Sequence, residues 1–199
     1  EALTALHAAG YVHRDLKPEN LWVVPGGAIG SHRIKVLDLG IAGLIESSSD
    51  SRLGRKDLRV GDEARLTQAG QTLGTPLYMS PEQAIGNPLD QRSDLYSLGC
   101  VLWELATDQC AFEGKTLLDI MHAQVATIPP PPSHVNPELP DWFDDLVMRL
   151  LAKKPEERFQ SAAEAGRAFL EKCGAVGIVN PLSASMTMSS PSSIKSATR

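Results

Sequence analysis

The sequence predicts a mainly α-helical domain with one short β-hairpin near its start. Residues 93–105 are apolar on nearly every side, which is typical of a buried central helix. Segments 117–125 and 142–151 repeat apolar residues at spacings of three and four, the period of one helix face. Two short β-prone runs, 21–24 and 33–37, flank a glycine-rich turn and therefore predict the hairpin.

The remaining elements follow from local signals. Residues 1–9 have a helical spacing, and we expect His7 in this helix to pack or to face solvent. A last helix is expected from Ser161 to about residue 172, because a serine cap opens it and Gly174 follows it. The four consecutive prolines at 129–132 favour an extended polyproline II link, which is either a spacer or, as the alternative, an SH3-type ligand.

The composition bounds the class of protein. With 42% hydrophobic and 22% charged residues, the chain has the make-up of an ordinary soluble globular protein. We expect one domain over 1–173 and a disordered Ser/Thr/Met-rich tail or linker over 174–199, because the end of the chain lacks periodicity. The net charge of −5 does not indicate the basic surface that nucleic-acid-binding proteins carry. No apolar run approaches the roughly 18 residues that span a bilayer.

The cysteines indicate a reducing compartment. There are three of them, an odd number without metal-ligand spacing, which argues against a disulfide framework. Cys100 lies in the central apolar run, so we expect a buried and inert thiol there. A cytoplasmic location fits these observations best.

One stretch concentrates the groups that phosphoryl transfer needs. Residues 13–20 read His-Arg-Asp-Leu-Lys-Pro-Glu-Asn, which places one acid, one amide and two fixed cations behind a short apolar segment. A transferring phosphoryl group carries charge on its oxygens, so its site needs cations, metal ligands and an acceptor for the proton of the attacking hydroxyl. Asn20 follows Asp15 at the spacing of the kinase pattern His-Arg-Asp, four residues, Asn. This stretch resembles the catalytic loop of a protein kinase.

The resemblance implies a role for each polar residue of the loop. In the motif that begins at His13, Asp15 would be the catalytic base that accepts the hydroxyl proton of a serine or threonine. Lys17 would place its ammonium on the transferring phosphate, and a lysine here goes with serine/threonine rather than tyrosine kinases. Asn20 would bind Mg²⁺ through its carbonyl oxygen, and Glu19 would lie with the nucleotide-binding residues.

A second motif ends the second predicted strand. Asp38-Leu39-Gly40 is similar to the Asp-Phe-Gly metal motif of the family, with Leu39 in place of Phe. By this resemblance Asp38 would bridge Mg²⁺ to the phosphates of ATP, with Gly40 in the turn that follows. Leu39 keeps an apolar side chain, smaller than that of Phe. The balance between the active and inactive packing of this motif is therefore left open.

Residues 41–73 resemble a long activation segment, rich in charge of both signs. Arg14, directly before the proposed base, is typical of kinases that are switched on by phosphorylation of this segment, where that arginine grips the phosphate. Thr67 is the preferred phosphorylation site and Thr72 the second.

Residues 74–82, Gly-Thr-Pro-Leu-Tyr-Met-Ser-Pro-Glu, are similar to the substrate-docking loop of the family, which closes in Ala-Pro-Glu. The resemblance implies that Thr75 hydrogen-bonds toward the catalytic loop and helps to set the serine/threonine preference. It also implies that Glu82 forms an ion pair with Arg158 of the lower lobe. By the same resemblance, the Asp94 carboxylate would bind the backbone of the catalytic loop and so position Asp15. Ser93 or Asp94 as a simple helix N-cap is the alternative for that position.

The sequence is identified as the mainly helical C-terminal lobe of a serine/threonine protein kinase of the bacterial type, over residues 1–173. It holds no Gly-x-Gly-x-x-Gly loop, so we expect the N-terminal lobe to lie upstream and this fragment to be inactive alone. The resemblance implies ATP and Mg²⁺ as cofactors and proteins with Ser/Thr hydroxyls as substrates. A full-length protein anchored to a membrane elsewhere is compatible with this, and the alternative function is a non-catalytic scaffold that binds partner proteins.

Overall fold

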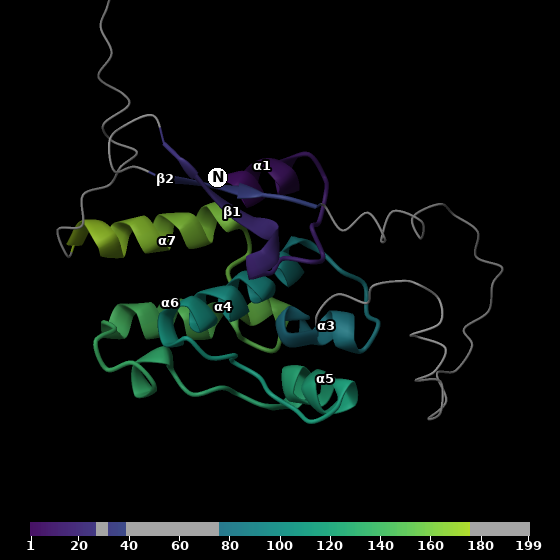
Figure 1. Cartoon of the computed structure of the whole chain (residues 1–199). Helices are drawn as coiled ribbons and strands as arrows, with labels where there is room; N and C mark the ends of the chain where they lie inside the picture. Colours follow the sequence, from purple (N-terminus) through teal and green to yellow (C-terminus); the bar gives the residue numbers. More distant parts are fainter. Residues whose placement is uncertain (27–31, 39–75, 176–199) are drawn as a thin grey trace, which may run out of the picture.

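The computed structural model describes residues 1–26, 32–38 and 76–175 (Figure 1). The proposed sites Gly40, Thr67, Thr72 and Thr75 lie outside these ranges. The helices are α1 (Ala2–Ala8), α3 (Pro81–Ala84), α4 (Gln91–Thr107), α5 (Leu117–Ala126), α6 (Asp141–Leu150) and α7 (Ala162–Ala175). The strands are β1 (Leu21–Pro25) and β2 (His32–Val36), and the 3₁₀ turns are Pro18–Asn20, Pro76–Tyr78, Pro132–His134 and Pro155–Glu157.

The described residues form a mainly helical fold with one two-stranded antiparallel sheet, as the sequence predicted. The sheet is the expected hairpin, in which Val23 pairs with Ile34 and Leu21 with Val36. In Figure 1 the hairpin and α1 lie at one end of the molecule, above α7, while α4, α6 and α5 lie below. Residues 13–20, the predicted catalytic loop, lie between α1 and β1.

Helix α4 is the centre of the core. Leu95, Tyr96 and Val101 are fully buried on it, as expected of a helix that is apolar on nearly every side. At Gly99 a Cβ atom would come within 2.9 Å of the Leu150 Cβ atom, so only glycine allows α6 to approach this closely. The N-cap is Asp90, whose side chain accepts a hydrogen bond from the backbone N–H group of Arg92.

The position of the cap corrects one alternative. Ser93 and Asp94 are not N-caps; both lie inside the first turns of α4 and both are buried. Their side chains are therefore available for contacts with other parts of the chain.

Helix α5 departs from the amphipathic pattern. Leu117 and Leu118, expected on its apolar face, are exposed, whereas the polar residue Gln124 is fully buried. A buried amide is tolerated when its hydrogen-bonding groups are paired, and those of Gln124 are, as described below.

The C-terminal elements also differ in detail from expectation. Helix α7 begins at Ala162 but continues through Gly174 to Ala175, beyond its expected end.

The proline run is more than a spacer, because Pro129 and Pro132 are buried and the carbonyl oxygen of Pro130 accepts a hydrogen bond from Trp103 Nε1 at 3.0 Å. Cys100 is buried as predicted, and burial raises the pKa of its thiol.

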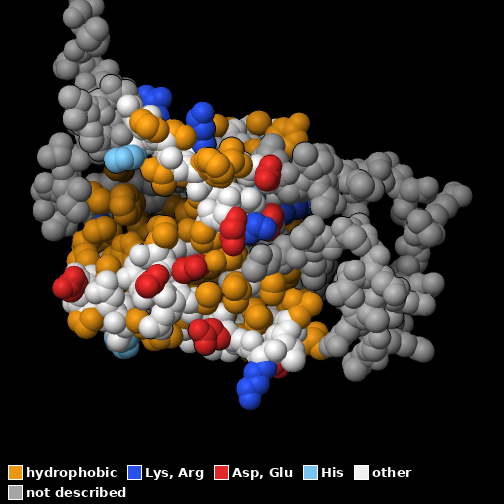
Figure 2. Space-filling view, viewed as in Figure 1, with side chains coloured by type: hydrophobic (Ala, Val, Ile, Leu, Met, Phe, Trp, Pro, Cys, Tyr) orange, Lys and Arg blue, Asp and Glu red, His pale blue; other side chains and the backbone are white. Residues whose placement is uncertain are grey.

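The hairpin carries apolar side chains on its surface. Trp22, Val23 and Ile34 are each about 60% exposed, and Figure 2 shows apolar side chains gathered at this end of the molecule. None of the helices over the described ranges is both long and apolar enough to cross a membrane.

Candidate active site

The catalytic-loop residues are held by a carboxylate from the central helix. Asp94 is fully buried, and its two oxygens accept hydrogen bonds from the backbone N–H groups of His13 at 2.8 Å and Arg14 at 2.9 Å. Charge-assisted bonds of this kind are stronger than neutral ones, and their partners here come from positions 80 and 81 residues away in the sequence. The contact is the one that the family resemblance implied for Asp94.

Two histidines complete this support. His7 Nε2 lies 2.8 Å from Asp94 Oδ2, which ties α1 to the same carboxylate. His13 is fully buried; its Nε2 atom lies 2.9 Å from the carbonyl oxygen of Leu37, and its Nδ1 atom accepts from the backbone N–H group of Asp15 at 3.3 Å. The His13 ring therefore joins the catalytic loop to the end of β2.

The predicted base Asp15, the predicted phosphate-binding Lys17 and the predicted Mg²⁺ ligand Asn20 lie together. Lys17 Nζ is 2.8 Å from Asp15 Oδ2. Asn20 Nδ2 donates to the Asp15 backbone oxygen at 2.7 Å and to its Oδ2 atom at 3.2 Å. Asp15 and Lys17 both remain partly open to solvent, whereas Asn20 is buried. A carboxylate held between an amide and an ammonium has a fixed orientation while still reachable by a substrate.

The oxygens expected to bind Mg²⁺ come from adjacent segments. The backbone N–H group of Leu37 donates to the backbone carbonyl oxygen of Asn20 at 2.8 Å, which brings Asp38 next to the predicted catalytic loop. Asp38 is exposed, and because Asn20 donates through Nδ2, its Oδ1 atom is the acceptor that can face a cation. Carboxylate and amide oxygens are ligands of the kind that Mg²⁺ takes, so this donor set fits the ion. No cluster of three or more His, Cys, Asp or Glu side chains suited to a metal occurs among the described residues.

The backbone is strained at two of these positions. Arg14 has a φ of 68° and Asp38 a φ of 51°, both in the left-handed region. For residues other than glycine such conformations cost on the order of 1–3 kcal/mol, and they gather at functional sites. The hydrogen bonds of Asp94 and His13 hold this strained loop in place.

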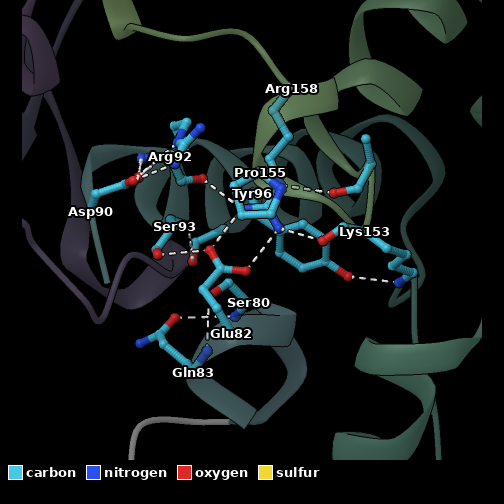
Figure 3. A network of polar contacts seen from close by, with 12 residues as sticks. Ser80, Glu82, Gln83, Asp90, Arg92, Ser93, Tyr96, Lys153, Pro155 and Arg158 are labelled. Atoms are coloured by element: carbon cyan, nitrogen blue, oxygen red, sulfur yellow. Dashed lines mark hydrogen bonds and ion pairs between the residues drawn. The ribbon is translucent and has the colours of Figure 1, made fainter. Parts of the chain in front are cut away.

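Glu82 and Arg158 form a buried, bidentate ion pair (Figure 3). Arg158 Nη1 lies 2.7 Å from Glu82 Oε1, and Nη2 lies 2.8 Å from Oε2. Ser93 Oγ donates to Glu82 Oε1 at 2.7 Å. Burial raises the pKa of Glu82, but the hydrogen bonds and the charge of Arg158 outweigh it and leave this pKa below its ordinary value. The pair fixes α3 onto the helical core.

Helix α3 is also bound to the catalytic loop itself. Ser80 and Gln83 form a capping box, with the Gln83 N–H group donating to Ser80 Oγ and the Ser80 N–H group donating to Gln83 Oε1. The Nε2 group of Gln83 then donates to the backbone oxygen of Arg14 at 2.8 Å. Helix α3, which begins at the end of the predicted docking loop, therefore contacts the predicted catalytic loop through Gln83.

Two of these contacts could not be anticipated from motifs. His7 was expected only to pack or to face solvent, and Gln83 had no predicted role. The Ser-x-x-Gln pattern of the capping box is readable in the sequence, but the bond from Gln83 to Arg14 spans 69 residues and has no local signal. Glu19 is exposed at the turn before Asn20, and no described contact links it to the cluster.

Comparison with known proteins agrees with this geometry. The chain matches the model of the protein kinase domain over residues 1–168. It is 39% identical to serine/threonine-protein kinase Pkn1 of Myxococcus xanthus over 163 residues, 82% of this chain and 21% of Pkn1. It is 40% identical to pkn3 of the same bacterium over 172 residues, 85% of this chain and 29% of pkn3. It is 39% identical to PknB of Mycobacterium tuberculosis over 164 residues, 82% of this chain and 23% of PknB.

The chain belongs to the protein kinase family. The resemblance to bacterial serine/threonine kinases, drawn from the motifs, is confirmed. The chain spans less than a third of the length of these three relatives.

Proposed function

We propose that this chain supplies the catalytic loop of a kinase that transfers the γ-phosphoryl group of ATP to serine and threonine hydroxyls of proteins. The observation that carries the proposal is the cluster of Asp15, Lys17 and Asn20, with contacts of 2.7–3.2 Å, on a loop fixed by the buried Asp94. Such a transfer requires little covalent chemistry from the protein, so positioned charges account for most of the catalysis.

In this proposal Asp15 accepts the proton of the attacking hydroxyl. Its Oδ2 atom faces the Lys17 ammonium, which is placed to stabilise charge on the transferring phosphate. Asn20 orients the Asp15 carboxylate through Nδ2 and offers its Oδ1 atom, together with the exposed Asp38 carboxylate, as ligands for Mg²⁺. The bound ion would supply charge neutralisation of the ATP phosphates. We assign these residues to the lower, helical lobe of a two-lobed kinase.

We further propose that residues 1–199 assayed alone are inactive. They contain no Gly-x-Gly-x-x-Gly loop to cover the phosphates, so ATP is held without in-line geometry. The test is transfer of radiolabelled phosphate by the full-length protein and by residues 1–199, with casein as substrate. We expect turnover of roughly 1–100 s⁻¹ from the full-length protein and none from the fragment. Phosphotyrosine as the product, or no transfer by the full-length protein, would refute the proposed function.

A further inference from the structure

The 3₁₀ turn Pro76–Tyr78 is attached to the core through every one of its carbonyl groups. Gln124 Nε2 donates to the oxygen of Pro76 at 3.0 Å and to that of Leu77 at 2.7 Å. Ser97 Oγ donates to the oxygen of Tyr78 at 2.7 Å. Both side chains that make these bonds are buried, Gln124 on α5 and Ser97 on α4. A turn that is bound in this way keeps one backbone position.

The orientation of the Gln124 amide is fixed by a chain of directed hydrogen bonds. Lys153 Nζ donates to Tyr96 Oη at 2.9 Å, and Tyr96 Oη donates to Gln124 Oε1 at 2.7 Å. Because Oε1 accepts from a hydroxyl, Nε2 must face the two carbonyls, where its two hydrogens are both used. A flipped amide would set oxygen against oxygen at Pro76 and Leu77.

Lys153 is the first donor in this series of hydrogen bonds, and no carboxylate among the described residues pairs with it. Its Nζ atom donates to the backbone oxygen of Gln124 at 2.8 Å and lies 4.2 Å from the centre of the Phe112 ring. The Phe112 ring stacks on that of Tyr96, with centroids 6.3 Å apart. Burial lowers the pKa of Lys153 to about 8, whereas its neighbour Lys154 is exposed and pairs with Glu157. The two adjacent lysines therefore have different environments.

We propose that Gln124, oriented by Tyr96 and Lys153, is a positioning residue for the binding of protein substrate. The three side chains act through the Pro76–Tyr78 turn, which lies within the segment that resembles a substrate-docking loop and precedes the capping box of α3. This inference rests on the proposed function and deepens it. Gln124 touches neither the Asp15 cluster nor Asp38 in the described contacts, so its effect falls on protein substrate and not on ATP.

The test compares Gln124→Met with the matched control Gln91→Met in the full-length protein. Gln91 also donates through Nε2 to a backbone oxygen, that of Gln160 at 2.7 Å, but this bond is exposed and makes no contact with the Pro76–Tyr78 turn. Loss of the two bonds from Gln124 is expected to raise the KM for casein about tenfold, with the KM for ATP unchanged. Gln91→Met is expected to change neither KM.

Hydrogen exchange gives a readout independent of activity. In Gln124→Met the amides of Leu77, Tyr78, Met79 and Ser80 are expected to exchange faster than in the wild type, and in Gln91→Met at the wild-type rate. Tyr96→Phe, a milder variant that keeps the ring, is expected to shift exchange and KM in the same direction, and to add nothing in the Gln124→Met background.

The outcomes separate the two proposals. Unchanged exchange at residues 77–80 in Gln124→Met would overturn the anchoring, and faster exchange with an unchanged KM for casein would overturn its role in substrate binding. A wild-type protein that transfers no phosphate refutes the proposed function, while the exchange measurement still decides the anchoring.

Discussion

Replacing Arg158 by alanine should be among the most destabilising substitutions in this fold. All five N–H groups of the guanidinium donate: two to Glu82 and one each to the backbone oxygens of Arg92, Ala152 and Lys153, at 2.7–3.0 Å. The variant leaves the buried Glu82 carboxylate without its cationic partner, although the Ser93 hydroxyl still donates to it, and it removes the donor to three backbone carbonyl oxygens. Breaking a buried pair in this way costs about 3–5 kcal/mol, a large part of the stability of an ordinary domain.

Urea denaturation followed by circular dichroism measures this loss, with Lys154→Ala as the control. Lys154 pairs with Glu157, three residues further along the chain, but both side chains are exposed, so the control is expected to unfold as the wild type does. A loss for Arg158→Ala within about 0.5 kcal/mol would refute the structural role of the pair, because that is the range of ordinary surface substitutions.

The same pair predicts a pH dependence. Because the pKa of Glu82 is lower in the folded protein than its ordinary value of 4.5, the unfolded state takes up the proton first on acidification. The stabilisation is therefore complete above about pH 4.5 and is lost as the pH falls below it. The difference in stability between the wild type and Arg158→Ala should shrink in that window.

Three further predictions concern the loop, the half-buried Lys153 and activation. Asp94→Asn should lower kcat about 10²-fold with little change in the KM for ATP, because an NH₂ group would face a backbone N–H group of the catalytic loop; steady-state kinetics measure this. The pKa of Lys153 is lowered to about 8 in the folded protein, so the unfolded state binds more protons between that pH and about pH 10.5. The free energy of unfolding of the wild type should therefore rise over this range, and that of Lys153→Met should not. Urea denaturation midpoints measured across the range test this. Mass spectrometry after ATP incubation should find phosphate on Thr67; modification confined to the serines at 47–51 would contradict that assignment.

Sequence reasoning succeeded where a pattern is long or tied to a motif. The apolar run around Leu95 and Val101 predicted the buried helix because no other placement hides so many apolar side chains. Glu82 and Arg158 were paired across 76 residues through their places in two family motifs, and the structure contains that pair. The Asp94 contact was anticipated in the same way, although its effect on catalysis stays a prediction.

Polar residues inside amphipathic helices were the ones that sequence reasoning missed. Gln124 lies on a helix among apolar neighbours and reads as solvent-facing, because its burial depends on partners 28, 29, 47 and 48 residues away. His7 is similar, since its partner Asp94 lies 87 residues further on. Leu117 and Leu118 gave the opposite error: helical spacing shows that residues share a face but not what covers that face.

The most direct test of the catalytic assignment is phosphate transfer by Asp15→Asn in the full-length protein, with ATP binding measured in parallel. Asp145→Asn, the same change at an exposed position of α6, is the matched control. Asn keeps the size of the side chain but cannot take up the hydroxyl proton, so we expect transfer to casein to fall at least about 10²-fold while ATP still binds. The control should transfer at the wild-type rate. Undiminished transfer by Asp15→Asn would contradict the role of Asp15 as the base.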